Sequence, residues 1–95
     1  MLLEGQVVRS VAGHDSDRFY MVVKLDKNSA WIADGARRKL LAPKRKNLLH
    51  LTKTTAVLDA RAISNDKQLR LALKEYNIPN GGGAQVEREG GVRLV

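Results

Sequence analysis

A chain of 95 residues has room for one small domain and is too short for two domains with separate hydrophobic cores. Its formal net charge is +7 at pH 7, from 17 Lys and Arg residues against 10 Asp and Glu residues, and the absence of cysteine excludes disulfides, thiolate metal sites and a thiol nucleophile. No apolar run approaches the roughly 20 residues of a membrane span, and the N-terminal residues lack the pattern of a secretory signal, so we expect a soluble, cytoplasmic protein.

The first part of the chain has the residue patterns of β-strands. Residues 5–12 are rich in valine and predict a first strand. Residues 18–25 have an apolar residue at every second position from Phe19 to Leu25, which predicts a strand with one buried face. Turn-forming residues follow, and residues 29–33 predict a third strand.

The next predicted element is a hairpin. Asp34-Gly35 favours a tight turn because both residues tolerate positive φ, and residues 37–42 would form the returning strand. Pro43 cannot donate a ladder hydrogen bond, so it would end that strand or confine it to an edge. With a fifth short strand over residues 48–51, the pattern predicts a small β-barrel or a strongly bent sheet.

The second part of the chain changes to the period of a helix. Apolar residues at positions 69, 72, 73 and 76 predict a short helix with an N-cap at Ser64 or Asn65 and an end before Pro79. Such a helix is marginal alone, so we expect it to dock on the barrel or on a partner. We therefore predict a mainly β domain in three parts, comprising a barrel over residues 1–52, a linker and docked C-terminal helix over 53–78, and a flexible glycine-rich tail over 79–95.

The excess positive charge lies in one quarter of the chain. Between Gly35 and Leu58 there are seven basic residues and no acidic residue, whereas the rest of the chain has ten of each. A local positive field attracts polyanions, so we favour a binding surface over a solvated face that only aids solubility. The basic residues of this segment are Arg37, Arg38, Lys39, Lys44, Arg45, Lys46 and Lys53.

Residues 5–15, with the sequence GQVVRSVAGHD, resemble a KOW motif, in which a hydrophobic strand ends in a glycine at a loop. The segments that follow are similar, in the same order, to bacterial KOW-domain RNA-binding proteins related to archaeal and eukaryotic large-subunit ribosomal proteins. These segments are WIADG (31–35), RKL (38–40), PKRKN (43–47), HL (50–51), ISND (63–66) and LALKEY (71–76). The resemblance covers about residues 4–77 and implies an SH3-like β-barrel that binds RNA, often ribosomal RNA.

The predicted RNA contacts form two groups. Residues 37–39 and 44–46 would lie near opposite ends of one strand, about 17–20 Å apart, along a path that could follow a phosphate backbone. In the loop over residues 13–17, backbone amides and His14 would approach a ribose or a base edge, while Asp15 and Asp17 would pair with Arg18 or Arg9. The full set of predicted RNA-binding residues is Arg37, Arg38, Lys39, Lys44, Arg45, Lys46, Lys53, Arg9, Gly13 and His14.

Aromatic side chains are few. Phe19 and Tyr76 have the positions of packing residues, and either Tyr20 or Trp31 could be a stacking platform, although the core is the favoured place for Trp31. Proteins that bind single strands by stacking usually expose several aromatic side chains. The composition therefore favours structured RNA recognised by shape and phosphate.

We expect no enzymatic activity, cofactor, metal ion or small-molecule substrate. The chain has only two histidines, no arrangement typical of a Ser-His-Asp site, and no glycine-rich loop followed by Lys and Ser or Thr. The residues from His14 to Asp17 offer too few converging ligands for a metal. Two alternatives remain, a protein-interaction module of the transcription or translation machinery that uses the barrel or helix, and, ranked last, attachment to an anionic membrane surface.

Overall fold

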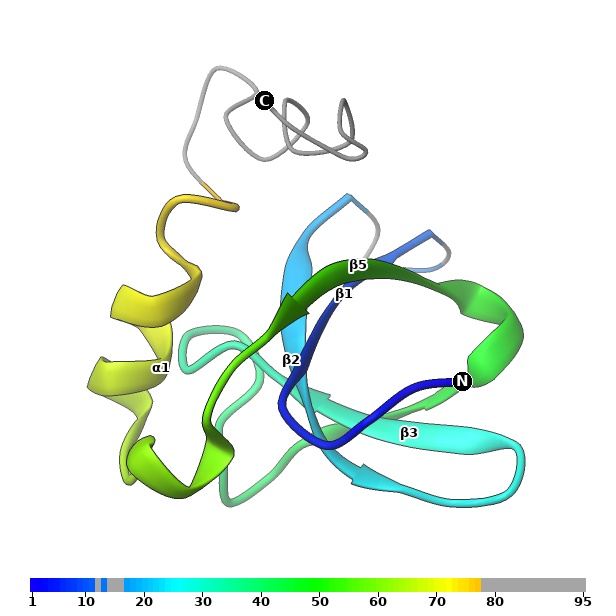
Figure 1. Cartoon of the computed structure of the whole chain (residues 1–95), viewed down its shortest axis with the longest axis horizontal. Coiled ribbons are helices and arrows are strands. Elements are labelled where there is room, and N and C mark those ends of the chain that lie inside the picture. Colours follow the sequence, from blue (N-terminus) through cyan, green and yellow to red (C-terminus); the bar gives the residue numbers. More distant parts are fainter. Residues whose placement is uncertain (12, 14–16, 78–95) are drawn as a thin grey trace.

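The computed structural model describes residues 1–11, 13 and 17–77, which form a mainly β fold with one short helix (Figure 1). The elements are β1 (Gln6–Ser10), β2 (Phe19–Leu25), β3 (Ser29–Ala33), β4 (Lys44–Asn47), the 3-10 turn η2 (Leu48–His50), β5 (Leu51–Val57), the 3-10 turn η3 (Ala60–Ala62) and α1 (Asp66–Leu73). The first three predicted strands and the mainly β class are confirmed. The predicted glycine-rich tail lies outside the described residues.

The five strands form one antiparallel sheet in the order β4-β3-β2-β1-β5. The strands from β1 to β4 follow one another across the sheet, and β5 returns to pair with β1 on the other side. The sheet curls strongly, and η2 joins the two edge strands (Figure 1). Among the described residues no ladder links β4 to β5, and this arrangement is compatible with the expected SH3-like barrel.

The sheet buries side chains on both faces. One cluster of buried residues, on the inside of the curl, contains Val8, Tyr20, Val22, Ala30 and Ile32. The other contains Val7, Phe19, Met21 and Ala33 from the sheet together with Leu69 and Leu73 from α1. The prediction of a single buried face for the second strand is therefore wrong at its first four residues, because α1 covers the face that would otherwise meet solvent.

The helix is shorter than the apolar pattern predicts. Asn65 is the N-cap, and its side chain accepts a hydrogen bond from the amide of Gln68 at 2.8 Å. The regular helix ends at Leu73, and the chain then turns so that Tyr76 packs on Phe19 with ring centroids 5.6 Å apart. Docking of the helix on the sheet is confirmed.

Three predicted boundaries are wrong. Residues 37–42 form a loop, and the returning strand is β4, which begins directly after Pro43. Residues 48–50 form η2, and the strand expected there is β5, which continues through residue 57. The expected division after residue 52 therefore falls inside a strand, because residues 53–57 pair with β1 instead of forming a linker.

Candidate nucleic-acid interface

A buried carboxylate organises the start of the loop over residues 34–43. The Asp34 side chain is 1% exposed, and its Oδ1 accepts hydrogen bonds from the amides of Ala36 at 3.0 Å and Arg38 at 2.9 Å. The Arg38 carbonyl accepts the amides of Asp34 and Gly35 at 2.9 and 3.0 Å. Because these groups bond within the loop, residues 36–38 cannot form the ladder that a tight hairpin would need.

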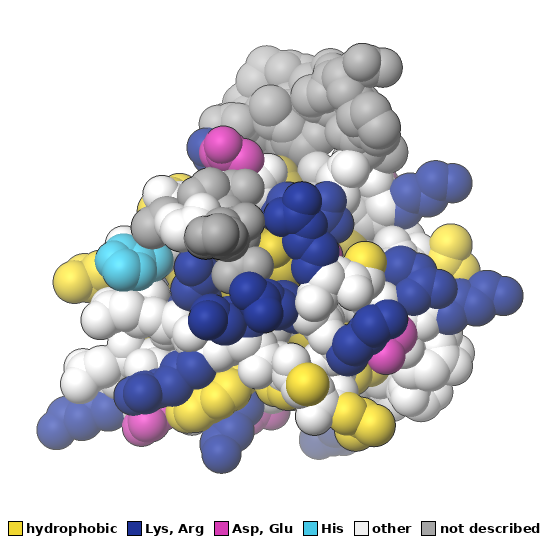
Figure 2. All heavy atoms as spheres, turned by 180° about the vertical axis from the view of Figure 1, so that it is seen from behind, with side chains coloured by type: hydrophobic (Ala, Val, Ile, Leu, Met, Phe, Trp, Pro, Cys, Tyr) yellow, Lys and Arg dark blue, Asp and Glu magenta, His cyan; other side chains and the backbone are white. Residues whose placement is uncertain are grey.

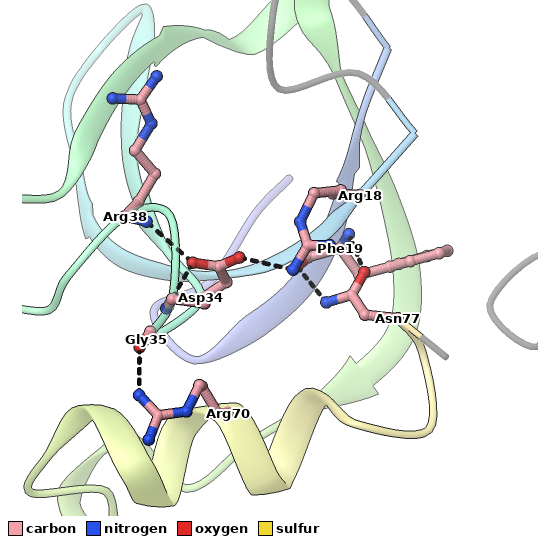
Figure 3. Close-up of polar contacts among 8 residues, drawn as sticks. Arg18, Phe19, Asp34, Gly35, Arg38, Arg70 and Asn77 are labelled. Atoms are coloured by element: carbon pink, nitrogen blue, oxygen red, sulfur yellow. Dashed lines mark hydrogen bonds and ion pairs between the residues drawn. The ribbon is translucent and has the colours of Figure 1, made fainter. Parts of the chain in front are cut away.

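Asp34 also forms an ion pair with a residue outside the loop. Its Oδ2 lies 2.9 Å from an Nη of Arg18, whose side chain is 30% exposed (Figure 3). This pairing was not among the predictions, which paired Arg18 with the 13–17 loop. Since its carboxylate is buried and paired with a cation, Asp34 contributes little negative potential to the basic surface beside it.

Helix α1 holds the same loop from the other side. Gly35 has φ of +80°, and a Cβ on it would lie 2.3 Å from the carbonyl oxygen of Asp66, so only glycine fits. The Asp66 carboxylate accepts a hydrogen bond from the amide of Leu40 at 2.8 Å. An Nη of Arg70 donates to the Gly35 carbonyl at 2.7 Å (Figure 3). The helix therefore fixes the backbone that carries the first basic cluster.

The basic residues of the loop and of β4 are mostly on the surface. Arg37, Lys39, Lys44 and Arg45 are exposed, and Arg38 is half-buried. The prediction that the two clusters lie near opposite ends of one strand is wrong. Instead, the first cluster lies on the 34–43 loop and the second begins β4 where that loop ends. We call Arg37, Lys39, Lys44 and Arg45 the basic surface.

Figure 2 views the molecule from behind and shows one face on which Lys and Arg side chains are spread widely, with few Asp and Glu side chains among them.

Lys46 differs from its two neighbours because it is buried, with 9% of the residue exposed. It pairs with Ala30 in the β3–β4 ladder and therefore shares the inner face of the sheet. A Cβ on Gly13 would lie 3.2 Å from the Lys46 Nζ, so the ammonium reaches the loop that follows β1. The prediction of Lys46 as a surface contact is wrong, and its position instead connects β4 with that loop.

The remaining predicted contact residues lie elsewhere. Arg9 on β1 pairs with Asp17 at 3.0 Å, as predicted for that aspartate. Lys53 lies on β5, the opposite edge strand, where its hydrogen bond with the Met1 amino group and its charge lower the pKa of that amino group from its ordinary value. Gly13 is exposed, with φ of +77°, while His14 lies outside the described residues.

Two aromatic assignments change. Tyr20 is fully buried in the inner cluster, so it cannot be a stacking platform. Trp31 belongs to neither core cluster and is only half-buried, contrary to the expectation that it packs in the core. The Lys24 Nζ lies 4.9 Å and the Arg45 Cζ 5.7 Å from the centroid of its ring. Sequence reasoning missed Lys24. The strand alternation was the available signal, because Trp31 lies between Ala30 and Ile32, which are buried, and therefore faces the other side of the sheet, where Lys24 lies beside it.

A shallow pocket of about 250 Å³ opens between α1 and the 34–43 loop. Its lining residues are Arg18, Asp34, Ala36, Arg70, Leu73, Lys74 and Asn77. Asn77 closes one side by exchanging two hydrogen bonds with the backbone of Phe19, at 2.8 and 2.9 Å (Figure 3). Three cations and one carboxylate line this pocket, so it extends the positive charge from the loop towards α1.

Within residues 1–11, 13 and 17–77, no three His, Asp or Glu side chains lie close enough to bind a metal ion together. None of the helices in that part of the chain has the length and apolar character needed to cross a bilayer.

No protein-family model matches the chain, and no curated protein matches it.

Proposed function

We propose that this chain is an RNA-binding module that uses the basic surface to hold the phosphate backbone of structured RNA. The observation that carries the proposal is the separation of charge around the 34–43 loop. Asp34 is buried in an ion pair, whereas Arg37, Lys39, Lys44 and Arg45 are exposed, and the sequence has no acidic residue between Gly35 and Leu58. A polyanion approaching this surface therefore meets cations without nearby exposed carboxylates in the same segment.

The fixed backbone of the loop supports binding in addition to its charge. The Asp34 and Asp66 carboxylates accept hydrogen bonds from its amides and Arg70 donates one to its carbonyl, so its backbone is held before any ligand arrives. A preorganised loop loses less conformational entropy on binding than a flexible basic segment of the same charge. Each phosphate neutralised by Lys or Arg releases a counterion, so the affinity should decrease steeply as salt rises.

The resemblance to bacterial KOW-domain RNA-binding proteins supports RNA as the polyanion. On that resemblance rests the finer proposal, which is a ribosome- or translation-related role in the cytoplasm with ribosomal RNA or the ribosome as partner. No small-molecule substrate or membrane partner forms part of this proposal.

Crosslinking of RNA to the protein in its native host, followed by sequencing of the bound RNA, tests the proposal. Co-sedimentation with ribosomes over a salt series accompanies it. We expect enrichment of ribosomal RNA with a defined footprint that is lost at high salt. RNA recovery no higher than that from a host lacking the protein would contradict the proposal.

A protein-interaction module is the second candidate, and two exposed leucines favour it. Leu41 in the 34–43 loop is 99% exposed and Leu49 in η2 is 86% exposed, and these positions flank β4 in the chain. Exposed leucines of this kind fit an apolar contact better than a phosphate contact. This function predicts a protein partner that stays bound at high salt and is lost when both leucines are changed to Ser.

A further inference from the structure

We infer that Trp31 stacks on an unpaired base of the bound RNA, at a platform formed with Lys24 and Arg45. This inference rests on the proposed function and adds base stacking to the phosphate contacts. It also narrows the substrate to RNA in which at least one base is unpaired beside the phosphates held by the basic surface.

The position of Trp31 in β3 is the first reason. Its neighbours Ala30 and Ile32 are fully buried on the inner face, so the Trp31 side chain lies on the outer face of the sheet. Ala33, two residues further on, shares that outer face and belongs to the cluster that includes α1. Trp31 does not belong to this cluster and keeps part of its surface open to solvent.

The second reason is the charge placed around the ring. In the sheet register Trp31 pairs with Lys24 on β2 and with Arg45 on β4, and both cations lie within 6 Å of the ring centroid. In the free protein the two cations cover part of the indole ring, which would otherwise be exposed to water. When RNA binds, the same cations can pair with phosphates while the indole, or the guanidinium stacked on it, receives a base.

The third reason is continuity with the basic surface. Arg45 belongs both to that surface and to the Trp31 platform, and Lys44 precedes it on the same edge strand. A backbone held by Arg45 therefore passes beside the indole. A fully paired duplex keeps its bases stacked and offers none to this ring, whereas a hairpin loop or bulge does.

Trp31 is the only tryptophan of the chain, so tryptophan fluorescence reports this site alone. The probes are an RNA hairpin with an unpaired loop and a fully paired RNA of similar length. We expect the hairpin to quench Trp31 fluorescence and to protect the ring from acrylamide, and the paired RNA to do neither at saturation. Quenching is measured on the unaltered protein, so it does not depend on the folding of any variant.

Variants provide the second arm. Trp31→Phe keeps an aromatic face and should bind the hairpin within about two-fold of the original affinity, whereas Trp31→Thr should bind it about ten-fold more weakly. Both should bind the paired RNA unchanged. Leu71→Ala is the control, because it removes an exposed apolar side chain that lacks a π-face and should change neither affinity.

The outcomes separate this inference from the proposed function. If the unaltered protein binds neither RNA, both fail. If it binds both with a steep salt dependence, while Trp31 fluorescence stays constant or Trp31→Thr binds the hairpin as tightly as the original, the stacking site is refuted and phosphate binding stands.

Discussion

Removal of the Asp34 carboxylate tests how the 34–43 loop is held. Asp34→Ala deletes the acceptor of two backbone amides, those of Ala36 and Arg38, and leaves the Arg18 guanidinium without its anion. Each hydrogen bond removed costs about 1 kcal/mol. Breaking a fully buried ion pair costs about 3–5 kcal/mol, but Arg18 is partly exposed and can be hydrated, so its share should be about 1 kcal/mol.

The sum predicts a loss of about 3 kcal/mol for Asp34→Ala, which is a large part of the roughly 5–15 kcal/mol that stabilises a small domain. For a chain of this size the Tm should fall by roughly 12–24 °C. Asp34→Asn keeps the oxygen that accepts the two amides but replaces Oδ2, the acceptor for Arg18, with an NH2 group. It should therefore cost less, about 1 kcal/mol.

Urea unfolding followed by circular dichroism measures both variants, with Glu4→Gln as the control because Glu4 is an exposed carboxylate. Double-mutant cycles with Arg18→Met then isolate the ion pair. A loss below about 0.5 kcal/mol for Asp34→Ala, as for an ordinary surface change, would refute the role given to this carboxylate.

Three further changes test the packing. Gly35→Ala places a Cβ 2.3 Å from the carbonyl oxygen of Asp66 and should lower the free energy of unfolding by about 2 kcal/mol or more. A Tm within about 2 °C of the original, which corresponds to roughly 0.5 kcal/mol, would contradict the close packing. Leu69→Ala should lower the free energy of unfolding, measured in urea, by about 2–5 kcal/mol, because Leu69 is fully buried between α1 and the sheet. A loss of stability below about 1 kcal/mol would mean that the helix is not docked there. Burial, and then the Glu75 carboxylate, raise the pKa of Tyr76 above its ordinary value of 10.0. Because the unfolded chain loses this proton first, stability should fall as the pH rises above about 10, and unfolding titrations of Tyr76→Phe should show a shallower fall; an equal fall in both proteins would exclude Tyr76 as the cause.

The sequence predicts most of the strands and the helix because their burial follows a simple period. It fails at Asp34, where the dipeptide favours a tight turn but the side chain reaches back to bind the amides that a hairpin would use. It also fails at β5, where Leu51–Val57 has no fully buried residue and therefore no marked alternation. Pairing with β1, which is distant in the chain, decides that segment.

The candidate site is predictable as a charged segment and less so residue by residue. Charge counting identifies the region but cannot tell that Lys46 is buried while Arg45 is exposed. The sheet register decides this, because it places Lys46 opposite Ala30 on the inner face and Arg45 opposite Trp31 on the outer face. The open surface of Trp31 was not expected either, since a lone tryptophan in an apolar strand is usually buried. In this chain the cover provided by α1 does not extend to it.

The most direct test of RNA binding through the basic surface compares two variants of equal charge. Lys44→Glu/Arg45→Glu and Arg61→Glu/Lys67→Glu each change exposed cations and lower the net charge by four, from +7 to +3. Affinity for one structured RNA is measured for both variants and the original protein over a range of salt concentrations.

We predict that the β4 variant binds at least about ten-fold more weakly and that its slope of log K against log salt is smaller by about 2, one unit for each phosphate that the variant no longer neutralises. The control variant should keep the original slope and lose little affinity. Equal losses in the two variants would mean that RNA responds only to net charge, and unchanged affinity of the β4 variant would contradict the basic surface as the binding site.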